Sequence, residues 1–180
     1  MLIVARFPPA PDHVVIALSD LDRALNGSAE QKADAGDLRA LQRPWEPDTC
    51  GTLLRSSVWT WCLEVAAWVN HEYGWRPEHM IPPCWPLHPH IARELPVLAV
   101  LRWIAHNSAE PVKLEEWHRD RLPGFLTRMA DRLGDSCGNG AHQDWPAAGR
   151  YDAYTGVQAT DAVERIIATD ARTWDTQHDA

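Results

Sequence analysis

The chain has 180 residues, of which 45% are apolar and 23% charged, and its formal net charge is −8 at pH 7. This length suits one domain, or two small ones, whose core needs no disulfides, and the apolar content excludes a disordered chain. The negative charge disfavours non-specific nucleic-acid binding, which requires neutralisation of phosphates. No apolar run reaches the length of about 20 residues that spans a membrane, so we expect no membrane attachment.

The start of the chain lacks the basic segment and cleavage site of a secretory signal peptide, which predicts a cytoplasmic protein. Disulfides are rare in that reducing compartment. The four cysteines, at positions 50, 62, 84 and 137, are therefore expected to be core thiols or metal ligands.

Residues 1–45 are predicted to form an N-terminal helical extension. Asp12 can cap a first helix, which ends at Asn26-Gly27. One face of this helix carries four apolar residues at helical spacing, namely Val14, Leu18, Leu21 and Leu25. Ser28 and Gln31 have the spacing of a capping box, which predicts a second and weaker helix.

Residues 46–150 are predicted to form a second, Trp-rich helical domain, because most of the ten tryptophans lie there. A long helix over 52–73 is apolar around most of its circumference, which is typical of a central, buried helix. We expect Trp61, Val65 and Trp68, which share one stripe of this helix, to be buried.

A helical hairpin follows the central helix. Residues 75–89 contain five prolines and predict an irregular loop. The outgoing helix spans 89–107, and the returning helix spans 111–133 with a break at Pro123-Gly124. Residues 151–180 are predicted to hold a short helix near 160–169 and a polar tail. With no alternating strand pattern, the fold class is predicted to be all-α.

Two Cys-His pairs lie just outside this hairpin. Cys84 and His88 form a C-x3-H pair, and Cys137 and His142 form a C-x4-H pair. Because an antiparallel hairpin brings its open ends together, the four side chains are expected to converge. Two thiolates and two imidazoles are typical of a structural zinc site. The sequence therefore predicts a zinc ion that links the open end of the hairpin.

Several alternatives remain for these residues. His90 can replace His88 as the ligand, or Cys84 and Cys137 can be small core hydrophobes instead of metal ligands. An iron–sulfur cluster is disfavoured, because the spacing of the four cysteines matches no common cluster motif. A zinc-dependent enzyme of the hydrolase type would need an open coordination position and a nearby acid or base, for which Glu94 and His118 are the candidates.

The motifs of nucleophilic and phosphate-binding enzymes are missing from the sequence, which favours a protein that acts by binding. His118 also belongs to a single Glu-x-x-His step, but a di-iron site requires two such steps. We expect His118 to be a buried, hydrogen-bonded side chain next to Trp117.

Four arginines cluster on the returning helix, interleaved with aspartates: Arg119, Arg121, Arg128 and Arg132. The pattern is typical of a solvated face with salt bridges. The alternative is a strip that faces phosphates, as in an accessory protein that binds nucleic acid.

The loop over 75–87 is the candidate surface for a protein partner. It gathers four large apolar side chains, namely Trp75, Met80, Ile81 and Trp85. Its prolines lower the entropic cost of presenting such a surface. The alternative is that these side chains pack back onto the central helix.

The segments Cys84-Trp-Pro-Leu-His88-Pro-His90, Trp117-His118-Arg119-Asp120 and Gly134-Asp-Ser-Cys137 resemble a group of known sequences. These are uncharacterised small Trp-rich helical proteins carried by actinobacterial phages, plasmids and integrative elements. The resemblance covers about residues 55–150. It implies a cytosolic accessory protein of a mobile genetic element and supports a site at Cys84, His88 and Cys137, but it implies no chemistry. The sequence thus predicts a zinc-stabilised, non-enzymatic module that binds a protein.

Overall fold

The computed structural model describes residues 4–134, 137, 142, 161 and 163–169. All regular elements in these residues are helical, which confirms the all-α prediction. The chain divides into two units, Met1–Ala141 and His142–Ala180. In the second unit, residues 161 and 163–169 are helical, within the range predicted for the last helix. In the described residues no helix combines the length and apolar character that crossing a membrane requires.

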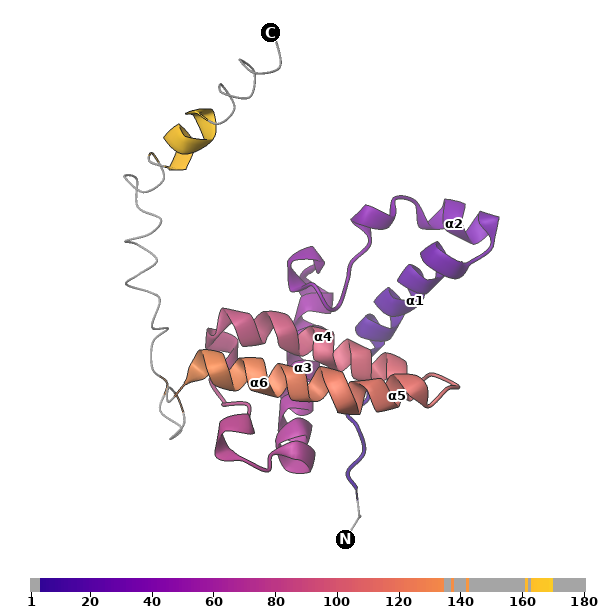
Figure 1. Ribbon diagram of the computed structural model, residues 1–180. Helices are drawn as coiled ribbons and strands as arrows, with labels where there is room; N and C mark the ends of the chain where they lie inside the picture. Colours follow the sequence, from indigo (N-terminus) through magenta and orange to yellow (C-terminus); the bar gives the residue numbers. More distant parts are fainter. Residues whose placement is uncertain (1–3, 135–136, 138–141, 143–160, 162, 170–180) are drawn as a thin grey trace. The chain divides into compact units, whose positions relative to one another are not determined.

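Within its described residues, the first unit has six α-helices (Figure 1). They are α1 (Asp12–Asn26), α2 (Ala29–Ala35), α3 (Thr52–Tyr73), α4 (Pro89–His106), α5 (Val112–Glu116) and α6 (Leu122–Leu133). Single turns of 3₁₀ helix lie at Leu38–Ala40, Pro47–Thr49, Pro77–His79 and Trp85–Leu87. A π-helical segment, Trp117–Arg121, joins α5 to α6.

The N-terminal helices form largely as their sequence predicts. Asp12 is the first residue of α1 rather than its cap, a position where its carboxylate still favours the helix dipole. The capping box of α2 is confirmed, because the Ser28 hydroxyl accepts from the Gln31 N–H at 3.2 Å and the Gln31 side chain accepts from the Ser28 N–H at 2.8 Å. Val14 and Leu18 belong to the same hydrophobic core as the buried residues of α3.

Helix α3 is the centre of the first unit. Trp61, Val65 and Trp68 are all buried, as predicted. Helices α4 and α6 lie side by side, and α3 crosses behind them and packs on α4 (Figure 1). Helix α3 ends at Gly74, where an added Cβ would overlap the sulfur of Met80 and lie 2.5 Å from the Asn70 carbonyl oxygen, so that a larger residue would force a shift.

The segment before α1 is tied to α3 by two indoles. Trp61 Nε1 donates to the Pro8 carbonyl at 3.1 Å, and Trp68 Nε1 donates to the Ala5 carbonyl at 3.2 Å. The ring of Phe7 lies edge-on to both indoles, with centroids 6.1 Å from Trp61 and 5.1 Å from Trp68. Buried tryptophans need a partner for their N–H groups, and the N-terminal carbonyls provide it.

The returning arm of the hairpin is not broken at Pro123, which corrects the prediction. The irregularity lies earlier, where the Leu122 N–H bonds to the Trp117 carbonyl in the i→i−5 pattern of a π-helix. Pro123 then occupies the first turn of α6, where a missing N–H is tolerated, and Gly124 continues the helix. The π-helical segment brings Trp117 and Leu122, five residues apart, onto the same buried face.

Candidate metal centre

The candidate metal centre lies where the two arms of the hairpin end. His88 is the residue directly before α4, and Cys84 precedes it by one 3₁₀ turn. Cys137 follows the C-terminus of α6 by four residues. Because α4 and α6 pack side by side, these positions meet at one end of the hairpin, as the sequence predicted.

Both thiols approach the same imidazole nitrogen. His88 Nε2 lies 3.5 Å from Cys84 Sγ and 3.4 Å from Cys137 Sγ. A tetrahedral zinc site with Zn–S of about 2.3 Å and Zn–N of about 2.0–2.1 Å has S···N edges of about 3.5 Å. A neutral imidazole nitrogen has one lone pair and cannot accept fully from two thiols. The geometry is therefore compatible with one metal ion held by all three residues.

His142 can provide a fourth ligand atom. The ligand atoms of Cys84, His88, Cys137 and His142 all lie within 4.8 Å of one another. His88 and Cys137 are buried, Cys84 is half-buried, and His142 is exposed. These are the four residues that the sequence predicted, so the structure gathers a Cys2His2 group that can hold a metal ion.

The neighbouring histidine and the other cysteines do not belong to this group. Of His88 and His90, the alternatives left open by the sequence, the structure places His88 among the ligands. Cys62 is buried in the middle of α3, and Cys50 donates to the Arg43 carbonyl at 3.3 Å. Burial raises the pKa of both Cys50 and Cys62, as expected for neutral thiols without a metal role.

Burial also raises the pKa of Cys84, and its hydrogen bond and charge interaction with Cys137 raise it further. Two neighbouring thiols are difficult to ionise together unless a cation is present. A divalent metal reverses this effect, since coordination deprotonates the thiol outright.

Glu94 is engaged in a salt-bridge network near the centre. Its carboxylate accepts from Arg128 Nε at 2.8 Å and from Arg132, so it joins α4 to α6. Burial by itself would raise the pKa of Glu94, but the hydrogen bonds and charges of the two arginines outweigh this and lower it. Glu94 is thus an anion fixed in an ion-pair network.

His118 lies on the π-helical segment and is exposed, so the prediction that it is buried is wrong. Its predicted hydrogen bond exists, because Nε2 lies 3.1 Å from the Tyr73 hydroxyl. Burial of part of the ring and the charge of Arg102 lower the pKa of His118. Neither Glu94 nor His118 belongs to the group of four residues that could hold a metal ion.

The predicted arginine cluster is a face with salt bridges. Arg119 bonds to Glu115 at 2.8 Å and to Asp120 at 3.1 Å, and Arg121 bonds to Glu116. Arg128 and Arg132 both bind Glu94. Each of these four cations therefore has a carboxylate partner within the chain.

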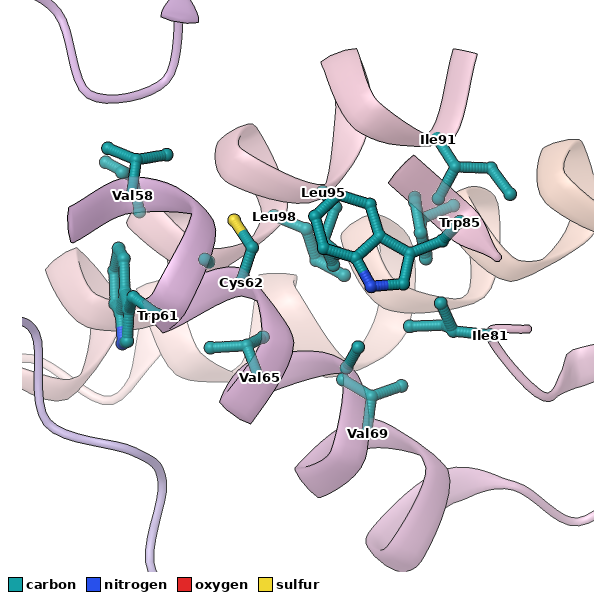
Figure 2. Packing of buried hydrophobic residues seen from close by; sticks show 14 of the residues in the cluster. Val58, Trp61, Cys62, Val65, Val69, Ile81, Trp85, Ile91, Leu95 and Leu98 are labelled. Carbon is teal, nitrogen blue, oxygen red and sulfur yellow. The ribbon is translucent and has the colours of Figure 1, made fainter. Parts of the chain in front are cut away.

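The structure divides the predicted partner-binding loop into two halves. Trp75 is 91% exposed and Met80 is 40% exposed. Ile81 and Trp85 are each only 3% exposed, so the prediction that they contribute to a surface patch is wrong. Both belong to the hydrophobic core, where Trp85 lies among Ile81, Ile91 and Leu95 (Figure 2).

The burial of Ile81 has a specific cause in α3. The side chain of Asn70 donates to the Ile81 carbonyl at 2.9 Å and accepts from the Ile81 N–H at 2.7 Å. The amide thus satisfies both backbone groups of one loop residue. The sequence signal for this contact is an amide side chain near the C-terminus of α3, next to the buried Val69.

Comparison with known proteins gave no match to a family model, to a curated protein or to a solved structure. The resemblance to proteins of mobile genetic elements therefore stays an expectation.

Proposed function

We propose that this protein is a zinc-stabilised helical module that acts by binding a protein partner in the cytoplasm, as an accessory protein of a mobile genetic element. The observation that carries the proposal is the Cys2His2 group at the end of the hairpin. Two sulfur and two nitrogen ligands suit zinc, which accepts tetrahedral geometry and ligands of intermediate softness. Four protein ligands leave no open position, which favours a structural over a catalytic metal.

The zinc ion would order the segments that flank the hairpin. Residues 74–88 contain no α-helix, and helix α6 ends at Leu133, four residues before Cys137. Coordination by Cys84 and His88 on one side and Cys137 on the other would fix both segments. The Glu94 ion pairs act at the same end of the hairpin and support this arrangement.

Trp75 is the candidate anchor for the partner. It is 91% exposed at the start of a loop that Asn70 holds at Ile81 and the metal would hold at Cys84. Tryptophan is enriched among the residues that dominate binding energy at interfaces. A loop fixed in this way loses little entropy on binding, and the net charge of −8 favours a basic partner. The assignment to a mobile element rests on the sequence resemblance alone.

Metal analysis tests the zinc site. Protein purified from zinc-supplemented medium should contain close to one zinc per chain by inductively coupled plasma mass spectrometry. Cys84→Ser and Cys137→Ser should lose it, whereas the control Cys50→Ser should keep it, because Cys50 lies outside the group. Metal-free wild-type protein, or equal zinc in all variants, would contradict the site.

X-ray absorption at the zinc edge distinguishes a structural zinc site, as in a binding module, from a catalytic zinc site, as in an enzyme. Two sulfur and two nitrogen neighbours support a structural ion, whereas three protein ligands with an oxygen neighbour would favour the zinc-dependent enzyme.

The partner is tested by capture from cells that carry the proposed mobile genetic element. Trp75→Ala should lose the captured protein, while Leu63→Ala, a second exposed apolar residue of this unit, should retain it. Equal capture by both variants would contradict the role of Trp75.

A further inference from the structure

An open pocket of about 720 Å³ lies between the segment before α1 and the C-terminal end of α4. Three basic residues line it, namely Arg6, Arg102 and His106, together with the aromatic residues Phe7 and Trp103. The lining residues include no aspartate or glutamate. This composition is unusual for a chain with a net charge of −8. Its volume falls in the range of about 300–1,000 Å³ typical of small-molecule sites.

Arg102 is enclosed by aromatic rings. Its guanidinium carbon lies 5.0 Å from the ring centroid of Phe7, 5.6 Å from that of Trp68 and 5.5 Å from that of Trp117. Such cation–π contacts position the guanidinium group but supply no hydrogen-bond acceptor. The three rings come from the N-terminal segment, α3 and the π-helical segment, so the position of the cation is fixed by the fold.

The guanidinium group of Arg102 has polar atoms that the described residues do not satisfy. Nε and Nη1 are both buried without a hydrogen-bond partner. Among the described residues, no carboxylate forms a salt bridge with it, in contrast to Arg128 and Arg132. The nearby carboxylate of Glu72 is engaged elsewhere, because its Oε1 accepts from the Ala5 N–H at 3.2 Å and lies 2.6 Å from His71 Nδ1.

A buried donor without an acceptor costs free energy, and a buried cation costs more. Burial lowers the pKa of Arg102, while an arginine remains charged at neutral pH. A bound oxyanion in the pocket that Arg102 lines would supply the negative charge that this cation lacks. Guanidinium groups bind such oxyanions with several parallel hydrogen bonds.

We propose that this pocket binds a small phosphate ester with an aromatic or apolar body, a property beyond the zinc-dependent binding function above. The phosphate would lie between Arg102, Arg6 and His106, and the body would lie against Phe7 and Trp103. Three basic side chains favour a dianionic phosphate over a singly charged carboxylate. The size of the pocket and its aromatic lining favour an ester over inorganic phosphate.

Isothermal titration of the zinc-loaded full chain with phenyl phosphate, inorganic phosphate and benzoate tests the proposal. Phenyl phosphate should bind at least about tenfold more tightly than either other probe. Arg102→Gln should weaken it by about tenfold or more. The matched control is Arg55→Gln, since Arg55 also lies over an indole, at 5.5 Å from the Trp59 ring, but has an acceptor in the Pro47 carbonyl at 2.6 Å. This control should bind as the wild type does.

Arg6→Gln keeps the test decisive if Arg102→Gln does not fold. Arg6 is exposed, so its loss should leave the fold intact while it weakens phenyl phosphate binding by several-fold. Dissociation constants above about 1 mM for all three probes would overturn the proposal. Unchanged binding in both arginine variants would also overturn it, and equal affinity for benzoate would overturn the assignment to a phosphate.

Discussion

His88 and Cys137 are 49 positions apart in the sequence, yet His88 Nε2 and Cys137 Sγ are separated by 3.4 Å. The whole hairpin lies between them, so a metal ion bound by both residues would close a long segment of the chain. Closing such a segment restricts the unfolded chain more than a short link does. The contribution of the metal to stability is therefore expected to be large.

Removal of the metal should destabilise one end of the hairpin first. Apparent zinc affinities in small structural sites correspond to about 10–16 kcal/mol, so chelation should greatly lower the free energy of unfolding. Hydrogen–deuterium exchange should rise at the start of α4 and the end of α6, and less in α1. Unchanged exchange after complete removal of zinc would contradict a structural ion.

Trp68→Ala should lower the free energy of unfolding by about 3–5 kcal/mol, as other large-to-small core changes do. The substitution removes a buried indole and its hydrogen bond to Ala5. The control is Trp75→Ala, which removes an exposed indole and should change stability by about 0.5 kcal/mol or less. Urea denaturation measures both, and similar losses in the two variants would contradict the packing of α3.

Asn70→Leu should cost about 2–3 kcal/mol, because it leaves the N–H and carbonyl of buried Ile81 without their side-chain partners. The loop that carries Cys84 should then exchange its amide hydrogens faster. Asn26→Leu is the control, since Asn26 makes an exposed hydrogen bond to Asp22 at 2.8 Å. Equal stability of the Asn70 and Asn26 variants would show that the loop is held by other contacts.

Glu94→Gln should lower stability by about 1 kcal/mol at pH 7, because Arg128 and Arg132 lose their shared anion. The folded-state pKa of Glu94 lies below its ordinary value of 4.5. Its stabilising contribution is therefore complete above pH 4.5 and is lost as the pH falls through the lower folded-state pKa.

The wild type should thus lose more stability on acidification than Glu94→Gln does, as measured by urea denaturation between neutral and strongly acidic pH. Glu115→Gln is the control, since its ion pair with Arg119 is exposed and should contribute little. Parallel pH profiles for the wild type and Glu94→Gln would contradict the role of this carboxylate.

Features that depend on local spacing could be predicted from the sequence. The capping box of Ser28 and Gln31 is confirmed, and the apolar circumference of residues 52–73 correctly indicated the central helix. The prediction that the two Cys-His pairs converge required one further assumption, namely that the two helices after residue 88 form an antiparallel hairpin. Because that topology is correct, four residues from two distant segments were placed together without any knowledge of side-chain contacts.

Features that depend on a particular distant partner could not be predicted. Trp75 and Trp85 are similar in sequence context, but Trp85 lies in a 3₁₀ turn that packs beside α4, whereas Trp75 follows the end of α3. The aromatic enclosure of Arg102 combines rings from three separate segments. Nothing in the local pattern around Arg102 distinguishes it from a surface arginine.

The π-helical segment Trp117–Arg121 contains one residue more than a regular α-helix would need between its two buried faces, so we expect the chain to tolerate a one-residue deletion there. A regular helix would bring Arg121 and Gly124, rather than Leu122 and Phe125, nearer to the face of Trp117, so the extra residue preserves the buried stripe. Deletion of the exposed Asp120 would convert the segment to regular helix while both buried faces remain aligned. Deletion of this residue is expected to leave a folded hairpin, whereas one-residue deletions inside α4 or α6 would rotate half of each helix away from the core.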